Sequence, residues 1–89
     1  MLRMSKRAVM AMEDSYNDRL IDAYSAAKRN VYSDFPMHLA KEAKAIHEEL
    51  CWMEEGGWIT SEEAGNLWKS IETSCQEFLA DWESEIDND

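Results

Sequence analysis

Hydrophobic residues recur every three or four positions along three segments of the chain, which is the spacing of one face of an α-helix. The first segment, residues 5–32, contains neither glycine nor proline, and its apolar positions repeat after eleven residues at Val9, Leu20 and Val31. An eleven-residue repeat indicates a nearly straight helix. The spacing therefore predicts a long first helix over residues 5–32.

The other two segments, residues 36–55 and 61–86, carry a heptad-like pattern. Their apolar positions are Leu39, Ala43, Ile46, Leu50 and Met53, and then Ala64, Trp68, Ile71, Cys75, Phe78, Trp82 and Ile86. Because the connection between the segments is short, they are predicted to form an antiparallel hairpin. With the first helix docked along this hairpin, the chain is predicted to be an all-α three-helix bundle that forms a single domain over residues 1–89.

The connection contains local signals that end one helix and start the next. Gly56 or Gly57 suits the left-handed conformation that closes a helix C-terminus. Thr60 followed by Glu63 matches a capping box, in which the two residues satisfy each other's backbone amides. The predicted hairpin register pairs Leu50 with Leu67, Ile46 with Ile71, Ala43 with Cys75 and Leu39 with Phe78.

Charge is divided unequally between the two halves of the chain, whose net charge is -10. Residues 1–44 contain 8 Lys or Arg and 6 Asp or Glu, a net +2, whereas residues 45–89 contain one Lys and 13 Asp or Glu, a net -12. This balance disfavours direct binding to nucleic acid or to an anionic membrane and favours a basic partner.

The sequence contains no signal for export or membrane insertion. Its longest apolar run near the start covers only residues 8–12, whereas a secretory signal needs about 7 to 15 apolar residues. No stretch approaches the roughly 20 apolar residues of a membrane span. We therefore expect a cytoplasmic protein whose two cysteines are reduced.

The residue types that bind metals or attack substrates are poorly placed for either role. His38 and His47 are nine residues apart, which puts them on opposite sides of one helix. Cys51 and Cys75 lack Cys-x-x-Cys spacing and a neighbouring base, and the hairpin register keeps them apart, so we interpret both as small buried hydrophobes. We expect no metal, no cofactor and no disulfide.

Catalytic motifs are also missing from the sequence. It contains no Walker loop, no Gly-x-Ser-x-Gly and no Gly-x-Gly-x-x-Gly. Paired carboxylates are abundant, but acid–base catalysis needs two carboxylates in contrasting environments within a pocket, which so small a chain encloses with difficulty. We expect a protein that is not an enzyme.

The aromatic residues divide into core and candidate surface positions. Trp68 and Trp82 fall on the apolar stripe of the third helix and are predicted to pack in the core. Trp52 and Trp58 either cover the end of the core or stand exposed, as aromatic anchors of interfaces do. The tyrosines at positions 16, 24 and 32 wind around the first helix, so at least one is expected at the surface, and homodimerisation is left open.

Acidic residues form two clusters that are the candidate partner-binding sites. The cluster at the tip of the hairpin consists of Glu48, Glu49, Glu54, Glu55, Glu62 and Glu63. The row on the third helix consists of Glu77, Asp81 and Glu85, spaced about 6 Å apart, which is close to the spacing of phosphates along a nucleic-acid strand. The hypothesis is that these carboxylates imitate phosphates and occupy the basic cleft of a nucleic-acid-binding protein.

Together these observations predict a protein that binds and inhibits another protein through the two acidic clusters and Trp52 or Trp58. In composition, although in no motif, the chain resembles small acidic helical inhibitors that phages encode against host enzymes and defence systems, which would place it in the host cytoplasm. The alternative is a non-inhibitory helical adaptor or subunit. In a further alternative the acidic half is neutralised by the chain's own bases, namely Arg3, Lys6, Arg7, Arg19, Lys28 and Arg29.

Overall fold

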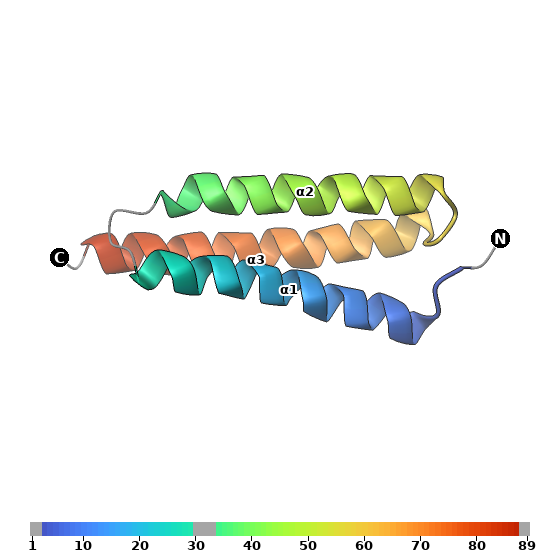
Figure 1. Ribbon diagram of the computed structural model, residues 1–89, viewed down its shortest axis with the longest axis horizontal. Helices are drawn as coiled ribbons and strands as arrows, with labels where there is room; N and C mark the ends of the chain where they lie inside the picture. The colour runs from blue at the N-terminus through green and yellow to red at the C-terminus, as the bar shows by residue number, and fades with distance from the viewer. Residues whose placement is uncertain (1–2, 30–33, 88–89) are drawn as a thin grey trace.

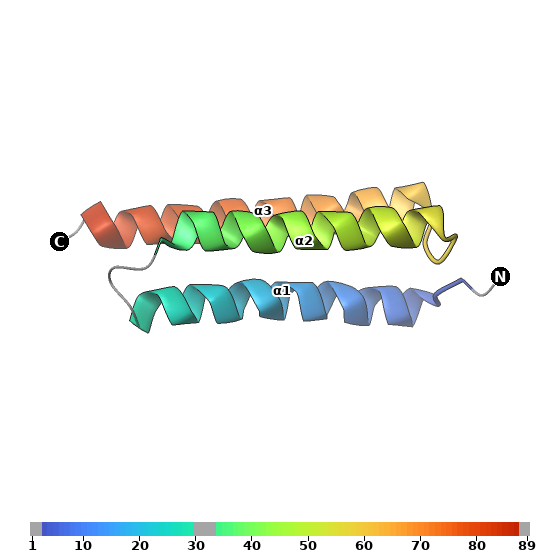
Figure 2. The same ribbon diagram turned by 45° about the horizontal axis from the view of Figure 1, so that its top comes forward.

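The computed structural model describes residues 3–29 and 34–87, which form three α-helices in up–down–up order. These are α1 (Lys6–Arg29), α2 (Phe35–Glu55) and α3 (Ser61–Asp87). Each helix contacts the other two, and their axes run side by side along the molecule (Figure 1, Figure 2). The predicted all-α bundle, with the first helix packed on an antiparallel hairpin, is confirmed. The part of the predicted first helix that covers residues 30–32 lies outside the described residues.

The bundle is a rod rather than a sphere. Its principal extents are 52 × 18 × 17 Å and its radius of gyration is 14.7 Å, compared with about 12 Å for a compact globule of this length. Because α1 and α3 run in the same direction, the start of α1 lies at the same end as the turn between α2 and α3 (Figure 1). The backbone N–H of Met4 donates a hydrogen bond to the carbonyl of Trp58 at 2.9 Å. The N-terminal segment is thereby attached to the turn.

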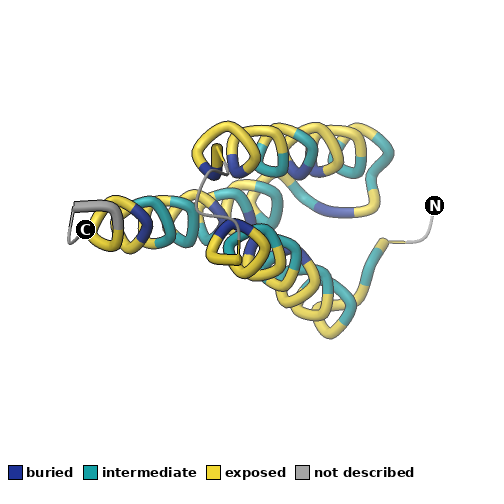
Figure 3. Tube along the Cα trace, turned by 60° about the vertical axis from the view of Figure 1, so that its left-hand side comes forward, coloured by how far each residue is buried: buried dark blue, intermediate teal, exposed yellow. Residues whose placement is uncertain are grey.

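The predicted apolar stripes face one another and form one core (Figure 3). The largest fully buried side chains come from all three helices and are Leu20, Phe35, Leu39, Ile46, Leu67 and Ile71. Across the hairpin, the ring of His47 packs edge-on against Trp68 with 4.8 Å between ring centroids. Burying side chains of this kind contributes about 1.5–3 kcal/mol each, which makes the core the main stabilising feature.

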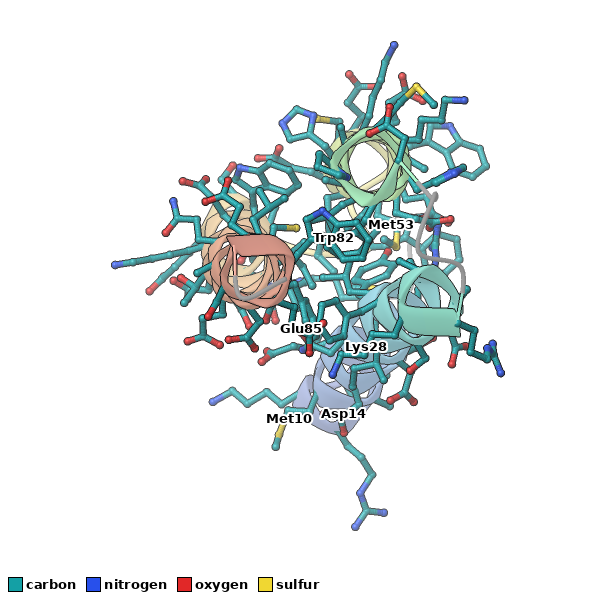
Figure 4. The ribbon with its side chains drawn as sticks, turned by 90° about the vertical axis from the view of Figure 1, so that its left-hand side faces the viewer. Met10, Asp14, Lys28, Met53, Trp82 and Glu85 are labelled. Atoms are coloured by element: carbon teal, nitrogen blue, oxygen red, sulfur yellow. The ribbon has the colours of Figure 1, made fainter. Side chains whose placement is uncertain are left out.

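Aromatic side chains fill the core at the end where α3 finishes. Phe35 packs against Tyr24 and Trp82, with ring centroids 5.3 and 5.4 Å apart, and Tyr24 packs against Phe78 at 5.1 Å. Trp82, which points between the helices in Figure 4, is only 8% exposed. The predicted core position of Trp82 is confirmed, whereas Trp68 is half-buried. Of the three tyrosines, Tyr16 is buried and Tyr24 is half-buried, while Tyr32 lies outside the described residues.

The turn between α2 and α3 closes with the hydrogen bonds of a Schellman motif. The N–H of Gly57 donates to the carbonyl of Glu54 at 3.1 Å, and the N–H of Trp58 donates to the carbonyl of Met53 at 2.9 Å. Gly57 has φ of 79°, whereas Gly56 is right-handed with φ of -76°. Of the two glycines that suited the left-handed position, Gly57 therefore occupies it, because a side chain there would be strained.

The predicted capping box at the start of α3 is confirmed. The N–H of Glu63 donates to the Thr60 hydroxyl at 3.0 Å, and the N–H of Thr60 donates to the Glu63 carboxylate at 2.9 Å. Such a capping threonine contributes about 1 kcal/mol to helix stability. Together with the Schellman motif, the box fixes both sides of the turn.

Polar contacts set the position of α1 along α3, and the apolar pattern did not predict them. Ser70 donates a hydrogen bond to the carboxylate of Glu13 at 3.2 Å, and one turn later Ser74 donates to the amide oxygen of Asn17 at 2.9 Å. The amide group of Asn17 also donates to the carbonyl of Glu13 at 3.1 Å. These bonds hold the two parallel helices in register beside the apolar core.

Replacing Ile71 tests the core directly, because Ile71 is 0% exposed and Ile21 provides a matched isoleucine that is 47% exposed. Ile71→Ala should lower the free energy of unfolding by about 2–5 kcal/mol, and Ile71→Val by about 0.5–1.5 kcal/mol. Ile21→Ala should change it by less than about 0.5 kcal/mol. Urea unfolding followed by circular dichroism measures all three, and equal losses at the two positions would contradict the described packing.

Candidate partner-binding surface

Trp52 and Trp58 stand exposed at the end of the bundle. Their side chains are 74% and 49% exposed, far more than the core tryptophan Trp82. Of the two interpretations that the sequence left open, exposure is therefore the correct one. Trp52 is exposed because it lies two positions after the buried Leu50, which turns it about 200° around α2 and away from the core.

An apolar groove with a volume of about 520 Å³ lies between these two tryptophans. Its other walls are Met4, Met53, Glu55 and Gly56. In a Schellman motif the residue after the left-handed glycine commonly contacts the third- or fourth-last residue of the helix, which here brings Trp58 to Met53 and Trp52. The groove therefore follows from the backbone geometry of the turn.

Gly56 allows the Trp58 indole to lie directly against the backbone. A Cβ atom at this position would be only 2.8 Å from Cδ1 of Trp58 and 3.0 Å from its Nε1. The carbonyl of Trp58 is held at the same time by the N–H of Met4. The sequence analysis did not identify Met4, Met53 and Gly56 as parts of this surface. Met4 could not be identified because only the fold brings it to the turn.

Two of the six glutamates at the tip are paired with bases that α1 and its preceding segment supply. Glu63 accepts from Arg3 at 3.4 Å, and Glu49 accepts from Arg19 at 2.8 Å. The other four are Glu48, Glu54, Glu55 and Glu62, and none of these forms a salt bridge within residues 3–29 and 34–85. Glu54 is half-buried, and the remaining three are exposed. The tip therefore keeps a net negative charge around the tryptophans.

The acidic row on α3 is exposed, but its last member is paired within the chain. Glu85 accepts from Lys28 at 3.1 Å, and the two side chains point toward each other in Figure 4. The hydrogen bond to Glu85 raises the pKa of Lys28. Glu77 and Asp81 form no salt bridge with any other part of the chain that the structure describes. The row therefore offers fewer unpaired charges than its spacing predicted.

Internal neutralisation, the further alternative from the sequence, is thus partly confirmed. Three of the six named bases, Arg3, Arg19 and Lys28, bind glutamates of α2 or α3. Arg19 binds both Glu42, at 3.1 Å, and Glu49, and its hydrogen bond to Glu49 raises its pKa. All these pairs lie at the surface, where screening by water keeps their contribution to stability small.

The interpretation of Cys51 as a buried residue was wrong. Cys51 is exposed because it follows the buried Leu50 and faces outward from α2. Its thiol also has a neighbouring base, since Nδ1 of His47, one turn earlier, is 3.8 Å from Sγ. Cys75 is half-buried, and this burial raises the pKa of its thiol. Both cysteines are free, and no three metal-binding side chains cluster within the described residues.

None of the described helices is long and apolar enough to cross a membrane. Comparison of the chain with known protein families, curated proteins and solved structures found no match. The function is therefore inferred from the features of the hairpin tip alone.

The capping box makes stability depend on pH. The pKa of Glu63 is lowered mainly by the hydrogen bond from the Thr60 backbone N–H. The Thr60 side chain and Arg3 lower it further by smaller amounts. A carboxylate with a lowered folded-state pKa stabilises the fold above its unfolded pKa of about 4.3 and loses this contribution as the pH falls through the folded value.

Glu63→Gln should therefore reduce the loss of stability below about pH 4.3, because glutamine keeps the capping acceptor but does not titrate. Urea unfolding at a series of pH values, with wild type and variant side by side, measures the effect. Glu63→Ala is the control, since it removes the acceptor and should lower stability already at neutral pH. Parallel pH curves for wild type and Glu63→Gln would contradict the assignment.

Proposed function

We propose that this protein acts by binding another protein with a basic surface, and that the hairpin tip, residues 48–63, makes the contact. The observation that supports this proposal is the pair of exposed tryptophans beside an apolar groove, surrounded by carboxylates that lack salt bridges in the described chain. Aromatic anchors within a polar rim are typical of the residues that dominate binding energy at interfaces.

Charge determines the kind of partner that this surface favours. Bases from the first half of the chain bind Glu49 and Glu63, while Glu48, Glu54, Glu55 and Glu62 remain available to an outside cation. A negative rim attracts a basic partner over distance and raises the rate of association, with strong dependence on salt. An acidic partner would be repelled by the same residues.

The form of this function that we favour is inhibition without catalysis. The protein would occupy the basic cleft of a nucleic-acid-binding or defence protein in the cytoplasm, as a phage-type inhibitor does. The tip glutamates, together with Glu77 and Asp81, would take the place of the phosphates. Because Glu85 is paired with Lys28, we expect the tip glutamates to contribute more to the contact than the α3 row does. The largely apolar groove supports the second candidate, a non-inhibitory adaptor or subunit that uses the same surface.

Charge reversal tests the tip against a matched control. One variant changes Glu48, Glu54, Glu55 and Glu62 to lysine. The control changes four exposed acids outside both acidic clusters, namely Asp18, Asp22, Glu72 and Glu83, to lysine, so that reversing four acids takes the net charge of both variants from -10 to -2. A partner captured from bacterial lysate by the wild type should bind the tip variant on the order of tenfold or more weakly and the control variant much less so. Undiminished binding by the tip variant would contradict the proposal.

Binding experiments with the same purified complex distinguish an inhibitor from an adaptor. An inhibitor that occupies a nucleic-acid cleft should be displaced by DNA or RNA, and its association rate should fall steeply with salt. An adaptor that docks through the groove should show neither behaviour.

A further inference from the structure

The groove at the hairpin tip has the chemistry of a binding site for an organic cation. Two of its walls are the indoles of Trp52 and Trp58, and the carboxylate-bearing Glu55 lines the same space. The face of an aromatic ring attracts a cation through its quadrupole, and tryptophan attracts cations more strongly than tyrosine or phenylalanine does. Met4 and Met53 add polarizable apolar surface for the methylene groups that accompany such a cation.

Two of the chain's own cations lie over tyrosines. The guanidinium carbon of Arg19 is 5.7 Å from the centre of the Tyr16 ring, and Nζ of Lys28 is 4.8 Å from the centre of the Tyr24 ring. Within the described residues no Lys or Arg lies over Trp52 or Trp58. The two indoles are therefore accessible to a cation from another molecule.

The groove is held in shape before any ligand arrives. The Trp58 indole lies against Gly56, the Schellman hydrogen bonds fix the backbone up to the Trp58 N–H, and the N–H of Met4 holds its carbonyl. A site that is already ordered loses less conformational entropy on binding. This pre-organisation distinguishes Trp58 from an exposed side chain on a free loop.

We propose that the groove between Trp52 and Trp58 receives an arginine side chain of the protein partner. The guanidinium stacks on an indole and donates to the carboxylate of Glu55, while its methylenes lie against the methionines. Arginine fits better than lysine because its guanidinium is planar, weakly hydrated and able to bind a carboxylate through two N–H groups. This inference rests on the proposed function and adds to it the residue type that the tip recognises.

The probes that test it are hexa-arginine and hexa-lysine peptides, which carry equal charge. In ¹⁵N-labelled protein, the indole N–H signals of Trp52 and Trp58 should shift on titration with hexa-arginine, while those of Trp68 and Trp82 serve as internal references. Hexa-arginine should bind about two- to fivefold more tightly than hexa-lysine, and Trp58→Leu and Glu55→Gln should each weaken its binding by a similar factor. Gly56→Ala should weaken it as well, because the added Cβ displaces the indole.

Glu72→Gln is the matched control, since it removes one exposed acid far from the groove and should leave the preference for arginine unchanged. Equal binding of the two peptides, or equal shifts at all four indoles, would overturn the proposal by showing only general attraction to the acidic surface. If hexa-arginine fails in this way while tip reversal still abolishes partner binding, the arginine site is wrong and the proposed function stands. If the peptide binds as expected while tip reversal leaves partner binding intact, the proposed function fails instead.

Discussion

The helices α2 and α3 pack against each other through their apolar faces, and this contact aligns the two helices. Ile46 and Ile71 are completely buried, and their burial sets which residues of the two helices lie side by side. The Schellman motif at Gly57 then ends α2 and begins the turn. This turn places Trp58 beside Met53, so the surface groove depends both on the core that aligns α2 with α3 and on the backbone geometry of the turn.

Folding also changes how the unequal charge of the chain is presented. The bases in the first half of the sequence come to lie beside the acidic second half, and Arg3 and Arg19 neutralise part of the tip while Lys28 neutralises the end of the α3 row. These exposed pairs contribute little stability, but they decide which carboxylates face a partner. The unpaired acids near the tryptophans attract a basic partner over a long range, and the tryptophans add a short-range apolar contact. The first raises the rate of association and the second adds specificity for the partner.

Features that depend on local sequence could be predicted, and features that depend on distant pairing could not. The three helices, the capping box of Thr60 and Glu63, and the buried Trp82 follow from spacing within one segment. The salt bridge of Glu85 joins residues 57 positions apart, and the groove needs Met4 beside the turn, so neither leaves a local signal. Cys51 was misplaced because one position beyond the buried Leu50 turns a side chain by about 100° around the helix, which is enough to move it out of the core.

Amide hydrogen exchange, measured on the protein with and without its captured partner, shows whether the hairpin tip is the surface that meets the partner. If the tip makes the contact, exchange should slow on binding from the last turn of α2 through the first turn of α3, around Trp52, Trp58 and Glu62. Slowing confined to the part of α3 that carries Glu77 and Asp81, with an unchanged tip, would contradict it.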